Sequence, residues 1–281
     1  MCEFCLKHGE GKKWYLQASN YSDDLLSDIR RRKKIEGFFS NPGHLTRSVG
    51  YLNVLEKAPK FIQGMVGRLI TGRQKKSHFG QVVPIEEVEK IFGFVGSIVR
   101  VACICRHATL GQEKRYCYGV SMSPNGGELA KIMKGLDNSF ITGPDTSGLE
   151  ILSKQEAMSA FRDHEREGLC HTVWTFQSPF IGGICNCDRA DCLAMRCTVT
   201  HSVPVMFRAE YIGEVDHDVC NGCRECMRVC QFGAIVYSAS NRKVSIDQKR
   251  CYGCGICRSV CKKNAIRLND RNQVPSAANL W

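Results

Sequence analysis

Apolar residues recur at helical spacing in a segment around residue 90. After Pro84, which suits the first position of a helix, the apolar positions are Ile85, Val88, Ile91, Phe92, Val95, Ile98 and Val99. Their spacing of three and four residues predicts an amphipathic helix from 84 to 99. We expect this helix to lead directly into the segment Cys103-Ile-Cys105.

A second helix is predicted from its start and stop signals. Ser153 stands three residues before Glu156, which is the arrangement of a capping box, and Gly168 provides a stop. Ala157, Phe161 and His164 share one face of this helix. We therefore expect His164 to be packed against the core and not to bind a metal.

Other segments have weaker patterns. Residues 171–176 have the composition of a strand. A helix is expected after Ser22, ending in the basic run 30–34, which we interpret as a solvated helix face. The basic stretch 68–76 contains Gly72 and is expected to be a loop or linker.

The end of the chain contains an internal repeat. Four cysteines recur 31 residues later, and Gly222 recurs as Gly253; the two sets are Cys220, Cys223, Cys226, Cys230 and Cys251, Cys254, Cys257, Cys261. Between the halves, 235–237 and 243–246 are expected to form a hairpin. We therefore divide the chain into a basic helical region at 1–82, a cysteine-rich α+β region at 83–208 and a pseudo-symmetric unit at 209–281.

The cysteine content decides which chemistry is open to the chain. There are 18 cysteines in 281 residues, and the start of the chain has no apolar segment typical of a secretory signal. The longest apolar run, 91–99, is about half of the roughly 20 residues that a membrane span needs. We therefore expect a cytoplasmic protein, in which such cysteines bind metals more often than they form disulfides.

The net charge needs correction for such metals. The formal charge is +11, but a [4Fe–4S] cluster with four thiolates carries a net charge of −2, so two of them lower it to about +7. This moderately basic balance favours redox partner proteins with acidic surfaces. Binding to nucleic acid is less favoured.

The repeated spacing CxxCxxCxxxC is typical of [4Fe–4S] ligation. Two-residue gaps wrap three thiolates around one cluster, and the fourth cysteine points toward the neighbouring cluster. The pattern predicts crossed ligation by two sets: Cys220, Cys223, Cys226 and Cys261 for cluster 1, and Cys251, Cys254, Cys257 and Cys230 for cluster 2. Zinc is the alternative, but zinc sites use paired CxxC segments.

Residues 214–270 resemble the bacterial two-cluster ferredoxins. That family usually has proline after each fourth cysteine, whereas this chain has Gln231 and Lys262. Both residues restore a backbone N–H beside a ligand sulfur. We expect the cluster potentials to be raised somewhat as a result.

Six further cysteines bracket the middle region: Cys103, Cys105, Cys117, Cys185, Cys187 and Cys192. Cys-x-Cys pairs suit two ligands of one centre, so an additional metal centre is one interpretation, either a third [4Fe–4S] cluster or zinc. Buried inert thiols and a redox-active thiol pair are the others. Cys170 and Cys197 are expected to be core residues, and His107 and His171 are expected to be structural.

The middle segments are similar to parts of a family of longer ferredoxin-like proteins from anaerobes. The resemblance rests on VACICRH, on the turn 168–171 and on the ICNC segment, and it covers about residues 83–270. It implies an anaerobic redox setting. Near the start, Cys2, Cys5 and His8 have the spacing of part of a metal site, or belong to a frayed terminus with exposed thiols.

Electron transfer is the function that these patterns favour. The sequence contains no G-x-G-x-x-G dinucleotide fingerprint or phosphate-binding loop. One alternative is a ferredoxin-fused redox enzyme with a substrate-binding cluster in the middle region, where Asp188 and Asp191 could be ligands. The other is a redox-sensing regulator. The expected fold is α+β, with a helical, winged-helix-like N-terminal and middle region followed by a two-cluster ferredoxin domain.

Overall fold

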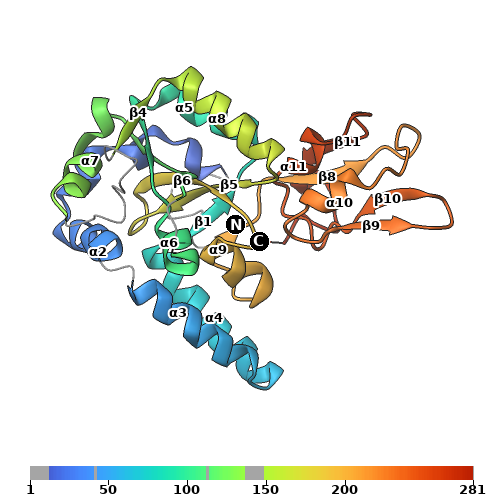
Figure 1. Ribbon diagram of the computed structural model, residues 1–281, viewed down its shortest axis with the longest axis horizontal. Helices are drawn as coiled ribbons and strands as arrows, with labels where there is room; N and C mark the ends of the chain where they lie inside the picture. Colours follow the sequence, from blue (N-terminus) through green and yellow to red (C-terminus); the bar gives the residue numbers. More distant parts are fainter. Residues whose placement is uncertain (1–12, 41–42, 112–113, 137–148, 281) are drawn as a thin grey trace.

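The computed structural model describes residues 13–40, 43–111, 114–136 and 149–280 (Figure 1). Cys2, Cys5 and His8 lie outside the described residues. A larger unit built on a mixed sheet carries, at one side, a smaller unit formed by the end of the chain. The mixed α+β class expected from the sequence is confirmed.

The larger unit is organised by a sheet in which the described residues form seven strands. The strand order is β4-β2-β3-β6-β5-β1-β7, and all neighbours are antiparallel except β1 and β7. The strands are β1 Gly80–Val82, β2 Ser97–Val101, β3 Cys117–Ser121, β4 Glu150–Leu152, β5 Cys170–Thr175, β6 Ile181–Cys187 and β7 Met206–Phe207.

Helices lie on both faces of this sheet (Figure 1). They are α2 Ile29–Ser40, α3 Gly43–Glu56, α4 Lys60–Ser77, α5 Ile85–Phe94, α6 Ile104–Leu110, α7 Gly127–Lys134, α8 Lys154–Arg166 and α9 Leu193–Met195, which continues into a π-helical turn Arg196–Thr200. Short 3₁₀ segments occur at Trp14–Leu16, Ala18–Tyr21, Asp23–Ser27, Pro124–Gly126 and Arg271–Gln273.

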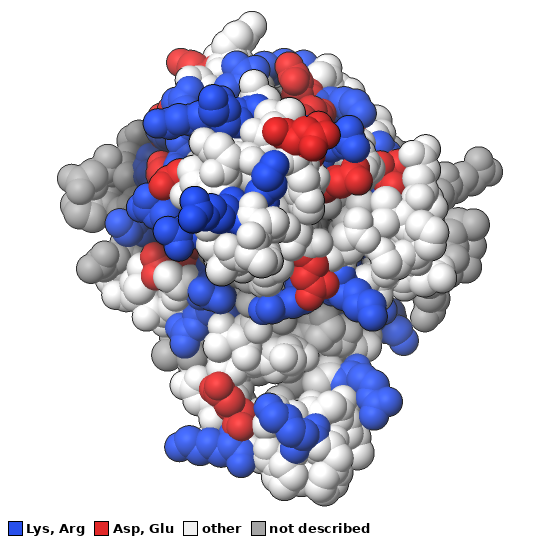
Figure 2. Space-filling view, turned by 90° about the vertical axis from the view of Figure 1, so that its right-hand side faces the viewer, with Lys and Arg blue, Asp and Glu red and all other residues white. Residues whose placement is uncertain are grey.

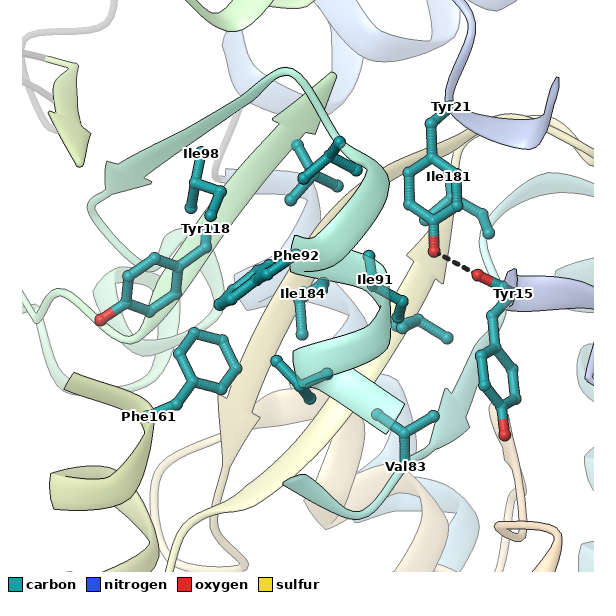
Figure 3. Close-up of a cluster of buried hydrophobic side chains, with 14 of the residues drawn as sticks. Tyr15, Tyr21, Val83, Ile91, Phe92, Ile98, Tyr118, Phe161, Ile181 and Ile184 are labelled. Atoms are coloured by element: carbon teal, nitrogen blue, oxygen red, sulfur yellow. Dashed lines mark hydrogen bonds between the residues drawn. The ribbon is translucent and has the colours of Figure 1, made fainter. Parts of the chain in front are cut away.

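One face of the sheet is covered by α5 and α8 and holds the main apolar core. Tyr118 and Ile184 from neighbouring strands meet Phe92 of α5 and Phe161 of α8 in this core (Figure 3). Trp14, Tyr15 and Tyr21, which precede the first long helix, pack into the same core, and the Tyr21 hydroxyl donates to the carbonyl of Tyr15 at 2.6 Å. The start of the described chain thus shares its core with the middle region.

The opposite face is covered by other helices. Phe39 of α2, Leu45 of α3, Ile104 of α6, Met133 of α7 and Leu193 of α9 belong to one apolar cluster with strand β2. This face also carries the cysteines of the middle region.

The smaller unit has two similar halves. Strand β8 Tyr211–Val215 pairs with β11 Ile266–Asp270, and β9 Ile235–Ser238 pairs with β10 Lys243–Ile246. Two short helices, α10 Glu225–Val229 and α11 Ile256–Ser259, lie against each other between these hairpins. The hairpin predicted at 235–246 is confirmed.

The helix at 153–168 is also confirmed. Ser153 caps α8 in a full capping box with Glu156, and Gly168 follows with a positive φ of 84°. His164 is buried on this helix and lies 2.8 Å from the Tyr118 hydroxyl. The strand predicted at 171–176 is present as β5.

The helix predicted over 84–99 is too long. Helix α5 ends at Phe94, and 97–101 form strand β2. Gly96 lies so close to the carbonyl of Met122 that a Cβ there would stand 2.1 Å from the oxygen. The chain turns at this point, and the β-branched residues after it alternate between the two faces of the sheet.

Two predictions about basic segments are wrong, namely the end of a helix at 30–34 and the loop at 68–76. The run 30–34 lies at the start of α2 instead of ending a helix, and Arg31 is buried, with its Nε donating to the carbonyl of Gln177 at 3.0 Å. The stretch 68–76 belongs to α4 and is not a loop. Gly72 does not break the helix, since tertiary packing outweighs the modest cost of one glycine in a helix.

A winged-helix-like region is not seen among the described residues. The two helices predicted in the middle region, α5 and α8, contact each other on one face of the large sheet. None of the helices in the described residues has the length and hydrophobicity needed to cross a bilayer.

Candidate metal centres

The smaller unit gathers its eight cysteines around two cavities. The first, site 1, is lined by Cys220, Cys223, Cys226 and Cys261. The second, site 2, is lined by Cys230, Cys251, Cys254 and Cys257. Each site thus combines three cysteines of one half of the repeat with the last cysteine of the other half.

Two equivalent glycines allow the chain to turn around these sites. Gly222 and Gly253 both have a φ of +69°. A Cβ at Gly222 would lie 1.9 Å from the carbonyl oxygen of Arg242, and one at Gly253 would lie 2.0 Å from that of Tyr211. No side chain can be placed at either position without moving the backbone.

Backbone amides point at the sulfurs in the same repeated way. The amide of Ala234 donates to Cys230 Sγ at 3.3 Å, and the amide of Ala265 donates to Cys261 Sγ at 3.3 Å. Such donors stabilise the negative charge on cluster-bound thiolates. Burial raises the pKa of Cys226 and of Cys251 to about 11, so these thiols are neutral until a metal replaces the proton.

Gln231, one of the departures from the ferredoxin pattern, joins the two units. Its side-chain amide donates to the carbonyl of Gly168 at 2.7 Å, and its side-chain oxygen accepts the amide of Arg189 at 2.9 Å. Lys262, at the matching position of the second half, is exposed. Proline at 231 could make neither side-chain bond, so this residue serves docking between the units.

In the larger unit, strand pairing brings several cysteines to one face of the sheet. Cys117 is the register partner of Cys185, and Cys187 is the partner of Cys170. Directly opposed residues of antiparallel strands share a face, as do residues two apart on one strand. These four thiols therefore lie on the face opposite to the apolar core of Figure 3.

A row of small residues runs beside these thiols. Gly119 pairs with Gly183, and Gly183 pairs with Trp174, whose ring lies over Gly80. At positions 119 and 183 the strands contribute no side chain to this face. The result is a cavity of about 170 Å³.

The cavity collects thiols from four segments of the chain. We call it the six-thiol cavity, after Cys103, Cys105, Cys117, Cys185, Cys187 and Cys192. Cys103 and Cys117 have their sulfurs 3.3 Å apart, and Cys187 and Cys192 have theirs 3.2 Å apart. Cys185 also contacts Cys117, and Cys105 contacts Cys192. All sixteen cysteines in the described part of the chain are free thiols.

A buried cation lies against these thiols. Arg106, 2 % exposed, forms an ion pair with Asp188, donates to the carbonyl of Asn186 at 3.1 Å, and has Nη1 3.7 Å from Cys103 Sγ. Hydrogen bonds with Cys105 and Cys187, together with this charge, hold the pKa of Cys192 well below its ordinary value. Asp188, a candidate ligand, is therefore already engaged with a guanidinium.

Cys170 lies between the six-thiol cavity and site 2. It is completely buried and contacts Cys254 of site 2. A hydrogen bond with Cys170 lowers the pKa of the Cys254 thiol. One continuous apolar cluster contains Cys170 together with Cys187 and Cys192 of the cavity. The core residue predicted from the sequence is confirmed, and its position beside site 2 follows from the packing of the two units.

The histidines of the middle region are arranged as structural residues. His171 is fully buried, with Nδ1 2.6 Å from the side-chain oxygen of Asn186 and Nε2 3.8 Å from a carboxylate oxygen of Glu165. His78, which the sequence did not single out, stacks on Trp174 beside the cavity, and burial lowers its pKa to about 4. Both His78 and Trp174 line the same cavity as the six thiols, which no sequence pattern indicated.

Comparison with known families identifies the smaller unit. Residues 219–266 match the family model of the 4Fe-4S dicluster domain, a segment that spans all eight cysteines of the repeat. A search of curated proteins gave no match. A dicluster domain implies two [4Fe–4S] clusters and iron–sulfur electron transfer. The residues present fit these clusters, because each site offers four thiols, a glycine turn and an amide donor.

Proposed function

We propose that this chain is an electron-transfer protein that relays single electrons between two redox partner proteins through its two clusters. The proposal includes crossed ligation, with cluster 1 at site 1 and cluster 2 at site 2. The observation that carries it is the composition of the two cavities, each lined by cysteines from both halves of the repeat.

The two sites differ in their surroundings, because site 1 is near solvent and site 2 is next to the larger unit. Cys223 of site 1 is exposed, as are the neighbouring residues 221 and 224. Site 2 lies against the larger unit, where Cys254 contacts the buried Cys170. Electrons therefore enter or leave the protein at cluster 1, and cluster 2 is the inner station.

Two basic residues line site 1. Arg224 and Lys263 are exposed and line the site 1 cavity itself. Lys and Arg side chains are spread over the side of the molecule that carries the smaller unit, with carboxylates between them (Figure 2). Such a surface favours an acidic partner protein and fast, salt-sensitive association. The cytoplasmic location and the anaerobic setting stay predictions from the sequence.

Matched single variants test the ligation. Cys261→Ala should leave the same remaining cluster as Cys220→Ala, and Cys230→Ala should leave the same one as Cys251→Ala. EPR spectra of the reduced, anaerobically purified proteins compare them. If the spectrum of Cys261→Ala instead matches that of Cys251→Ala, each half of the repeat binds its own cluster and the proposal is wrong.

The choice of partner has its own test. The rate of one-electron exchange with a small acidic carrier protein should fall as salt is raised, and the double variant Arg224→Gln with Lys263→Gln should weaken that dependence. A variant with two distant changes, Arg47→Gln with Arg73→Gln, serves as the control. An equal effect of both variants would show that the site 1 surface is not the docking surface.

A further inference from the structure

The six-thiol cavity has features that a packed core lacks. Protein interiors are close-packed, and buried free cysteines normally fill space as small apolar side chains. Here the thiols line a hollow of about 170 Å³, and the glycines at 119 and 183 keep its floor clear. Inert thiols do not account for such a hollow.

The thiols are assembled from separate parts of the chain. Cys103 and Cys105 stand at the start of α6, Cys117 begins β3, and Cys185 lies on β6 more than sixty residues later. Cys192 follows β6 and immediately precedes α9. Four segments thus present thiols to one space, which is the arrangement of a ligand set.

The number and placement of the thiols favour a cluster over a single ion. A structural zinc ion takes four ligands at about 2.0–2.3 Å, whereas a cluster spreads its thiolates over several irons. The six thiols line one cavity of about 170 Å³ and outnumber the four ligands that a single zinc ion takes. The buried guanidinium of Arg106 beside Cys103 offsets the negative charge that such a cluster brings.

We propose that the six-thiol cavity holds a third iron–sulfur cluster, with its ligands drawn from Cys103, Cys105, Cys117, Cys185, Cys187 and Cys192. Cys170 contacts Cys254 of site 2 and packs in the same apolar group of residues as Cys187 of the cavity. The third iron–sulfur cluster would therefore follow cluster 2 in the relay. In each step cluster 2 is oxidised by one electron and the third cluster is reduced by one. The electron comes from the one-electron donor protein of the proposed relay.

Metal analysis of the whole protein tests the assignment. The anaerobically purified and reconstituted chain should contain about twelve irons, eight from the dicluster domain and about four from the third cluster. Cys185→Ser with Cys187→Ser should lose about four irons and one reduced EPR signal, and should keep the two dicluster signals. Serine has nearly the volume of cysteine, so the sheet should be preserved.

Cys197→Ser is the matched control, because Cys197 lies on the wall of the same cavity but outside the thiol contacts described above. It should retain all the iron. Eight irons in the unmodified chain, with or without one zinc, would overturn the third cluster and leave the two-cluster relay intact. Fewer than eight would count against the relay instead. The unmodified chain therefore decides the question even if the double variant fails to fold.

Discussion

Replacing Gln231 by alanine should loosen the contact between the dicluster domain and the larger unit. The change removes two hydrogen bonds, one to the carbonyl of Gly168 at 2.7 Å and one from the amide of Arg189 at 2.9 Å. The first is partly buried and the second is exposed, so together they contribute about 1.5 kcal/mol. That free energy corresponds to roughly a tenfold increase in opening of the contact.

Hydrogen exchange followed by mass spectrometry can measure this opening. The backbone amide of Arg189 is bonded to the Gln231 side chain, so its exchange should become about tenfold faster in Gln231→Ala. Amides of helix α4, which does not take part in this contact, report whether the whole fold has changed.

The internal repeat provides the control. Lys262 occupies the position in the second half that Gln231 occupies in the first, and it is exposed. Lys262→Ala should leave the exchange of Arg189 unchanged. Equal exchange rates in the two variants would refute the idea that Gln231 fastens the units together.

Three other predictions concern folding. Burial lowers the pKa of His164 to about 4, whereas the same side chain in the unfolded chain has a pKa of about 6.5. Below pH 6.5 the unfolded chain therefore binds a proton that the folded chain does not. The free energy of unfolding should fall by about 1.3 kcal/mol as the pH drops from 7.5 to 5.5. Denaturant titrations at the two pH values should show this loss reduced in His164→Gln and unchanged in the exposed His217→Gln; the same loss in both variants would contradict it. In thermal unfolding, Gly222→Ala should lower the free energy of unfolding by about 2 kcal/mol, because of the positive φ and the facing carbonyl of Arg242. Gly64→Ala, at a position on α4 with open space around it, should be neutral or stabilising in the same assay. Phe161→Ala should cost about 4 kcal/mol in the core of Figure 3, and a denaturation midpoint close to that of the unmodified protein would show that the core can collapse around the gap.

The sequence predicted elements best where the signal is local. The capping box at Ser153, the stop at Gly168 and the hairpin between the cysteine repeats depend on neighbouring residues, and the structure has all three. The length of the helix after Pro84 was predicted wrongly, because its apolar β-branched continuation is equally suited to a buried strand. The deciding contact, between Gly96 and the carbonyl of Met122, joins positions far apart in the chain.

The same distinction holds for the candidate sites. The spacing of the repeat was sufficient to predict two clusters, because each ligand triplet is local and the fourth cysteine follows from the pattern. The position of Cys170 beside Cys254 and the joining role of Gln231 depend on how the two units pack. No pattern in the sequence around these residues carries that information.

The strand register of the large sheet decides both which residues enter the apolar core and which thiols line the cavity. On β6, Ile184 belongs to the apolar core, while Cys185 and Cys187 face the cavity. Inserting or deleting one residue in this strand would exchange the two sets, bringing thiols into the core and Ile184 to the cavity. Such an event would remove the thiol row and the stability of the sheet together. We therefore expect the connecting loops near this site to accept changes of chain length that these strands would not.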